Sequence, residues 1–374
     1  MREPPRAVRV QCGGHRTGGG DGASAGHRPG VPVLPARPLT QQRWKLRHAT
    51  DARASQLAEG LWCLRLPLHF VAPRSVNTYL IALADGYCLV DCGTSLEPGW
   101  EALEYALAEA GARPDQLSLL VCTHMHADHA GLAAEVVART GCELARGEGP
   151  ESADHVLRDP RLPLADRRRL GLREGLPRSE LDEWVDPAPE DDLDYPQVVA
   201  DRILVPGDQI ESAPGAWTVV PAPGHSPTQI LLHNPARGWL IMADLAYDVG
   251  EPFFEYGRTP DPYADHLDSL DRALGLHARL GFPGHGRVVE SPDHRLRVAR
   301  AAAESSRNRV LHALSADPQS AYELAMELLG PRKDPGERQS MISVALCVLE
   351  HLESRDLAAA EPDTDGVRRW RATS

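Results

Sequence analysis

Four side chains that commonly bind metal ions stand within six residues of this 374-residue chain: His124, His126, Asp128 and His129. They follow an apolar run at residues 117–123 and precede a helical pattern, so we expect them on a short loop after a buried strand. Neutral imidazole and carboxylate groups suit Zn²⁺ and also Fe or Mn ions. Because uncompensated burial of polar groups is costly, this spacing predicts a metal site.

Three further segments place candidate ligands directly after expected strands. They are His225 in Pro-Gly-His-Ser after residues 217–220, Asp244 after residues 239–242, and His285 in Pro-Gly-His-Gly. Each segment alone is also typical of a turn histidine, a strand-end aspartate or a glycine-rich loop. Together with the first motif they supply seven ligands, which is enough for two metal ions that share a carboxylate.

The hydrophobic pattern predicts an α/β fold with two strand-rich halves and a mostly helical C-terminal part. Short apolar runs bounded by turn signals predict strands, and apolar residues at helical spacing predict helices. The expected strands are residues 61–68, 77–84, 87–91, 117–123, 142–146, 203–205, 217–220, 229–234 and 239–242. The expected helices are residues 98–112, 131–140, 265–280, 320–329 and 339–354.

The chain is expected to divide into three parts. Residues 1–55 are predicted to be a disordered extension, because the first fifty are rich in Gly, Pro and Arg without hydrophobic periodicity. Residues 56–290 hold the strands and the candidate ligands, and are interpreted as the catalytic domain, with a polar helical insertion at about 151–195. Residues 291–374 form the third part.

The order of these motifs resembles the metallo-β-lactamase fold hydrolase superfamily over roughly residues 60–290. The resemblance implies an αββα sandwich, in agreement with the two strand-rich halves. It also implies a ligand assignment: His124, His126 and His225 for one metal ion, Asp128, His129 and His285 for a second, and Asp244 as a bridge between them.

The resemblance also implies residues that support the ligands. Leu89-Val90-Asp91-Cys92-Gly93 resembles the family's Leu-Val-Asp-Thr-Gly segment, with Cys92 in place of the usual Thr. Asp91 is therefore expected to orient a ligand loop. Thr123 is expected in the same supporting role, and Ser226 is interpreted as a turn residue with a structural hydroxyl.

The chemistry implied by this family is hydrolysis by a metal-bound hydroxide. Two cations that share a water lower its pKa from ~15.7 toward ~7 and polarise the electrophile. Asp128 or Asp244 would briefly accept a proton. The expected cofactors are two divalent ions, with Zn²⁺ favoured over Fe or Mn.

Asp244 narrows the expected substrate. True zinc β-lactamases, as a family, lack the bridging aspartate, and the full set resembles that of glyoxalase II-like thioesterases, lactonases and related nucleases. We therefore expect attack on a thioester or ester carbonyl, in an acyl-CoA-like molecule or a small ester. Lactonase, mononuclear iron dioxygenase and β-lactamase activities are less favoured.

The C-terminal part suggests an alternative function. Residues 307–311, 320–324 and 351–353 resemble the winged-helix-like domain of a subgroup that includes enzymes cleaving single-stranded RNA. A single-strand endoribonuclease or phosphodiesterase of the same fold is thus the alternative. However, residues 301–374 hold nine Lys/Arg against twelve Asp/Glu, and the net charge of the chain is −13. This balance disfavours a phosphate-binding surface, although a nucleic-acid partner stays open.

An aromatic segment after Asp244 is the candidate substrate wall. Phe253, Phe254, Tyr256 and Tyr263 are four of the twelve Phe and Tyr residues in the chain. One interpretation is an apolar wall for an acyl group, and the other is packing in the core.

Composition sets the expected location and partners. No run approaches ~18 consecutive apolar residues and no secretory segment is present, so neither a membrane span nor export is predicted. The seven cysteines are scattered and odd in number, which argues against a disulfide framework or a thiolate zinc site. We expect a cytoplasmic enzyme with a small-molecule substrate, and a homodimer stays open.

Overall fold

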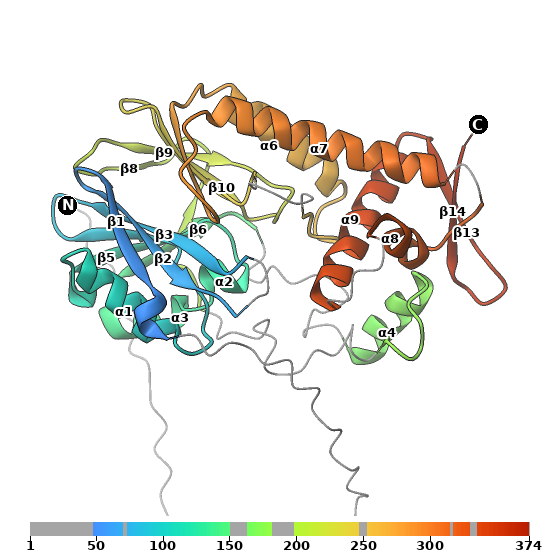
Figure 1. Ribbon diagram of the computed structural model, residues 1–374, viewed down its shortest axis with the longest axis horizontal. Helices are drawn as coiled ribbons and strands as arrows, with labels where there is room; N and C mark the ends of the chain where they lie inside the picture. Colours follow the sequence, from blue (N-terminus) through green and yellow to red (C-terminus); the bar gives the residue numbers. More distant parts are fainter. Residues whose placement is uncertain are drawn as a thin grey trace, which may run out of the picture. The chain divides into compact units, whose positions relative to one another are not determined.

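The computed structural model describes residues 48–69, 73–149, 163–181, 198–246, 253–314, 317–329 and 335–373 (Figure 1). Its first strand, β1 (Arg53–Ala58), lies at the edge of a sheet and pairs antiparallel with β2 (Leu61–Pro67). The expected extension 1–55 therefore runs too far into the chain. Residues 53–58 carry no strand signal because none of them is fully buried, which leaves the strand without an apolar pattern.

Seven strands form the first sheet, in the order β1-β2-β3-β4-β5-β6-β7. Pairing is antiparallel from β1 to β4 and parallel from β4 to β7. The bounds of the remaining strands are β3 (Ser75–Ala82), β4 (Tyr87–Val90), β5 (Leu117–Cys122), β6 (Glu143–Gly147) and β7 (Arg202–Leu204). The turn between β3 and β4 contains Gly86, whose φ of 82° favours glycine.

Five strands form the second sheet, in the order β12-β11-β10-β9-β8. All neighbours are antiparallel except β11 and β12, which run parallel. The strands are β8 (Gln209–Ile210), β9 (Trp217–Pro221), β10 (Ile230–Asn234), β11 (Trp239–Ala243) and β12 (Leu280–Pro283). The predicted helix 265–280 is wrong at its end, because α6 (Pro262–Leu274) stops before His277, whose φ is 49°, and Leu280 begins β12.

The two sheets pack face to face, and helices cover their outer faces (Figure 1). Buried side chains between the sheets include Val121 of the first sheet and Ile241 and Phe282 of the second. On the outer face of the first sheet lie α1 (Gly99–Glu109) and α3 (Ala133–Thr140). On the outer face of the second lie α6 and the start of α7 (Pro292–Ala313). The predicted αββα arrangement is confirmed.

The C-terminal residues build a separate apolar cluster. It contains side chains of α7, α8 (Ala321–Leu329) and α9 (Pro335–Glu353), together with Trp370. Trp370 belongs to a two-stranded hairpin, β13 (Ala358–Pro362) and β14 (Arg368–Ala372), that the helical pattern did not predict.

Part of the expected insertion joins the same cluster. Leu164 and Leu172 of α4 (Leu164–Arg173) pack against it, and the rest of the insertion lies largely outside the described residues. The winged-helix assignment stays a prediction. None of the helices in the described ranges is both long and apolar enough to span a membrane.

Phe282 tests the packing between the sheets. It is 1% exposed, and its ring centroid lies 5.8 Å from that of Tyr79 and 6.0 Å from that of Trp239. We expect Phe282→Ala to lower the free energy of unfolding by about 3–5 kcal/mol, because it leaves a cavity between the sheets. Urea titration followed by circular dichroism measures this. The control Val298→Ala, at a half-exposed helix position, should change stability by less than about 0.5 kcal/mol. Equal effects of the two variants would contradict the packing described.

Candidate metal centre

Loops at the ends of four strands bring the seven predicted ligands together. The loop after β5 and the following α2 (Ala127–Ala130) carry four of them, and the segments after β9, β11 and β12 carry one each: His124, His126, Asp128 and His129, then His225, Asp244 and His285. Both sheets therefore contribute to the cluster.

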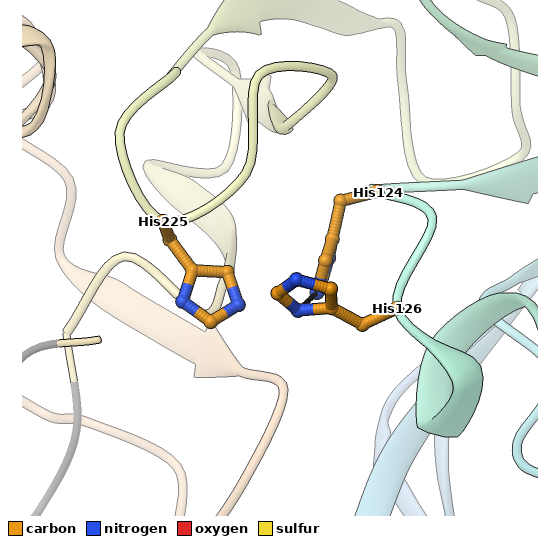
Figure 2. A group of neighbouring side chains, drawn as sticks. All are labelled: His124, His126 and His225. Carbon is orange, nitrogen blue, oxygen red and sulfur yellow. Dashed lines mark hydrogen bonds between the residues drawn. The ribbon is translucent and has the colours of Figure 1, made fainter. Parts of the chain in front are cut away.

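Three histidine rings form the first group. The rings of His124, His126 and His225 point toward one another across the loops that carry them (Figure 2). Ligand atoms of the three residues all lie within 4.8 Å of one another. The Nε2 atom of His124 lies 3.1 Å from Nδ1 of His126. The Nδ1 atom of His126 therefore faces the other ligands, and its Nε2 atom points away from His124.

Asp128, His129 and His285 form the second group. His285 Nε2 lies 3.2 Å from Asp128 Oδ2 and 3.4 Å from His129 Nε2. The ring of His129 is fully buried, and the side chain of Asp128 is 14% exposed. Both imidazoles thus present a nitrogen to the same carboxylate from within a nearly enclosed site.

Asp244 lies between the two groups. Its Oδ1 is 3.3 Å from His129 Nε2, and its Oδ2 is 3.3 Å from His285 Nε2 and 3.7 Å from His225 Nε2. The loop of His285 can approach this carboxylate because residue 284 is glycine. A Cβ atom on Gly284 would lie 2.1 Å from Asp244 Oδ1. Any larger residue at position 284 would displace the central carboxylate.

Burial and charge set the protonation of the ligands. Burial lowers the pKa of His124 and of His225 well below the usual value, which keeps a lone pair on each ring for a cation. Burial would also lower the pKa of His129. The nearby carboxylates outweigh this effect and raise that pKa; they belong to Asp244, Asp128 and Asp91.

The carboxylates stay anionic in this environment. Burial alone would raise the pKa of Asp128, but His129 and His285 together lower it to about 2. Burial alone would also raise the pKa of Asp244, but His285 and His129 outweigh this effect and lower that pKa well below its usual value. Two buried anions, together with the neutral imidazoles of His124 and His225, form a donor set that suits a divalent cation.

Asp91 lies where it can support the ligand loop. Its Oδ1 accepts a hydrogen bond from the Thr123 backbone N at 2.7 Å, and its Oδ2 accepts one from the Thr123 hydroxyl at 2.9 Å. The same Oδ2 lies 2.8 Å from Nδ1 of His129. Ser226 is buried, and its hydroxyl lies 3.2 Å from that of Thr228, which fits a turn residue.

The aromatic segment divides between the site and the core. Only Phe253 faces the ligands, with its ring centroid 5.7 Å from that of His126 and 5.5 Å from that of His225. Phe254, Tyr256 and Tyr263 are at most 6% exposed and belong to the C-terminal apolar cluster. The predicted substrate wall is therefore wrong for these three residues, because helices far along the chain cover them.

Sequence reasoning missed Glu255. This side chain is 1% exposed, and its Oε2 lies 3.7 Å from Nε2 of His126. It follows no strand, so the strand-end pattern that found the ligands does not include it. The available signal was a lone acidic residue inside the aromatic run Phe253-Phe254-Glu255-Tyr256.

The family profile of the metallo-beta-lactamase superfamily matches residues 71–285, which include all seven ligands. The chain belongs to this superfamily. It is 26% identical over 289 residues to a probable metallo-hydrolase of Bacillus subtilis, covering 72% of this chain and 85% of that protein. We therefore identify it as a metal-binding hydrolase of the metallo-beta-lactamase fold.

Two crystal structures are similar to it in fold. A metallo-beta-lactamase family protein from Thermus thermophilus is 24% identical, with a TM-score of 0.71 over 85% of this chain and 100% of that one. A beta-lactamase domain protein from Burkholderia ambifaria is 26% identical, with a TM-score of 0.66 over 85% of this chain and 94% of that one. These similarities extend beyond residues 71–285, so they include part of the chain outside the family profile.

Asp91 gives a test of the support around the metal site. We expect Asp91→Asn to weaken Zn²⁺ binding by about 10–100-fold, because an amide cannot accept all the hydrogen bonds from Thr123 and His129. Competition with a chromophoric chelator measures the affinity. Asp85→Asn, in the exposed turn after β3, is the matched control and should bind as the wild type does. Unchanged affinity in Asp91→Asn would contradict its supporting role.

Proposed function

We propose that this chain is a dinuclear metal-dependent hydrolase that attacks a thioester or ester carbonyl. The observation that carries this proposal is the position of Asp244, with one oxygen close to His129 and the other close to His285 and His225. In this proposal Asp244 bridges two ions. The first group of ligands is His124, His126 and His225, and the second is Asp128, His129 and His285.

In this proposal these residues would hold the ions and position the reacting water. When bound, a divalent cation lowers the pKa of a water molecule and polarises the carbonyl oxygen under attack. Asp128 and Asp244 would lie beside the reacting water, and the carboxylate of either could take up its proton. Asp128 is the more exposed, at 14% against 5% for Asp244, so it is the better placed to pass that proton on. We favour Zn²⁺ because it readily takes imidazole and carboxylate ligands, with Fe and Mn as alternatives.

An acyl substrate fits the surroundings of the ligands. Phe253 places an apolar ring edge-on to His126 and His225, where an acyl chain can pack. The buried carboxylate of Glu255 lies close to the same ring of His126 and disfavours an anionic phosphodiester as the group under attack. The net charge of −13 on the chain likewise disfavours a nucleic-acid substrate.

A matched substrate panel tests the reaction class. Initial rates would be compared on acyl-CoA thioesters, simple esters, lactones and single-stranded RNA, for the wild type and for His126→Ala. We expect turnover of a thioester or ester, and a loss of about 100-fold or more in kcat/KM in the variant, or about 2.7 kcal/mol of transition-state stabilisation.

The matched control for that panel is His294→Ala, which removes an exposed histidine from α7. It should keep the wild-type rates. Cleavage of RNA that disappears in His126→Ala, without turnover of any ester or thioester, would overturn the proposed substrate and favour the ribonuclease alternative.

Metal content tests the dinuclear assignment separately from the substrate. Elemental analysis of the protein loaded with Zn²⁺ should give two zinc ions per chain. Asp244→Asn should retain about one, because a neutral amide does not balance the charge of two cations as a carboxylate does. One iron ion per wild-type chain, without hydrolysis, would instead support the mononuclear dioxygenase alternative.

A further inference from the structure

Glu255 is a buried acid that the proposed mechanism does not use. Its side chain is 1% exposed, and among the described residues neither carboxylate oxygen has a hydrogen-bond partner within ordinary distance. Its nearest cationic groups are His126 Nε2, 3.7 Å from Oε2, and Arg258 Nε, 3.7 Å from Oε1. Burying a carboxylate with so few partners costs several kcal/mol, so its position requires an explanation.

The other ligand histidines show what such a residue does. His129 directs Nε2 toward the ligand cluster, and its Nδ1 lies 2.8 Å from Asp91. His285 does the same, with Nδ1 2.8 Å from the Ser75 carbonyl oxygen. In each case a fixed acceptor behind the ring sets its tautomer and orientation.

His126 has the reversed arrangement. Its Nδ1 faces the cluster, at 3.1 Å from His124 Nε2, and its Nε2 faces Glu255. We propose that Glu255 is the positioning residue of His126: its carboxylate, 3.7 Å from Nε2, favours the proton on that nitrogen, so that Nδ1 is presented to the ion. Arg258 holds the second carboxylate oxygen and balances the charge. This inference rests on the metal site of the proposed function.

The C-terminal helices hold Glu255 in place. The Ser343 hydroxyl on α9 donates to the Phe254 carbonyl oxygen at 2.6 Å and accepts from the Tyr256 backbone N at 3.1 Å. These bonds fasten the chain on both sides of Glu255. The Tyr256 hydroxyl adds a 2.8 Å hydrogen bond to Glu350 of the same helix. Helix α9 thereby becomes part of the support of the metal site.

The experiment measures metal binding in the full chain, with Co²⁺ as the probe. Wild type, Glu255→Ala, Glu255→Gln and the exposed-site control Glu353→Gln would be titrated with Co²⁺ against a competing chelator. The visible spectrum of each Co²⁺-loaded protein reports the geometry of its ligands. We expect Glu255→Ala to bind about 10–100-fold more weakly, with a shifted spectrum. Glu255→Gln should recover most of the affinity, because its amide oxygen still faces Nε2 and favours the proton on that nitrogen.

Two results would overturn the inference. One is a Glu255→Ala protein that binds Co²⁺ with wild-type affinity and spectrum. The other is a Gln variant that is as impaired as the Ala variant, which would indicate that shape alone matters. A wild type that binds no Co²⁺ or Zn²⁺ would instead overturn the proposed function itself. The two failures are therefore distinguishable.

Ser343→Ala keeps the proposal testable if Glu255→Ala fails to fold. The variant removes both hydrogen bonds that fasten the loop but leaves the carboxylate in the chain. We expect weaker Co²⁺ binding with a smaller loss than in Glu255→Ala. Ser305→Ala, at an exposed position of α7, is the control. Wild-type affinity and spectrum in Ser343→Ala would show that α9 does not support the site.

Discussion

The position of the ligand loop depends on the hydrogen bonds of the Asp91 carboxylate. This carboxylate receives two hydrogen bonds from Thr123 and lies within hydrogen-bond distance of His129, so it joins the ends of β4 and β5 to α2. Asp91 adopts a φ of 61°, a left-handed conformation that costs about 1–3 kcal/mol. Hydrogen bonds to a charged group contribute about 1.5–3 kcal/mol each, so three of them outweigh this strain. These bonds thus hold the loop in a backbone conformation that would otherwise be unfavourable.

The second constraint is that neither sheet can build the site alone. The backbone N of Asn77, in the first sheet, donates to the Gly284 carbonyl oxygen at 2.6 Å, and the Tyr79 hydroxyl donates to the Pro283 carbonyl oxygen at the same distance. Near the first motif, the backbone N of Ile230 donates to the Thr123 carbonyl oxygen at 2.8 Å. Since these bonds cross from one sheet to the other, packing of the sandwich fixes the ligand distances.

Residues whose positions depend on local structure could be predicted from the sequence. The ligands follow strands, so the ends of apolar runs located His124, Asp244 and their neighbours without knowledge of the fold. The αββα layers were likewise implied by the alternation of strands and helices and by the family resemblance. Strand β1 escaped prediction because an exposed edge strand needs no apolar pattern.

Residues whose positions depend on distant contacts could not be predicted. Phe254 and Tyr256 are covered by α9, about ninety residues later in the chain, and no local pattern reveals that contact. The same contact fixes Glu255, which local spacing cannot distinguish from a solvent-exposed acid. The hairpin β13–β14 could have been found from Asp365-Gly366, which is a turn signal between its strands.

The segment after residue 252 serves the metal site and the C-terminal core together, and this limits how substrate choice can change. Phe254 and Tyr256 fill the core, and Glu255 lies behind a ligand ring, so substitutions at these positions disturb packing or metal binding. Among the aromatic residues of this stretch, Phe253 alone faces the ligands without belonging to that core. Under the proposed function, position 253 is therefore where substrate preference can change, while the following residues stay hydrogen-bonded to α9. In that function the C-terminal helices would act on substrate choice by holding the segment that carries Phe253.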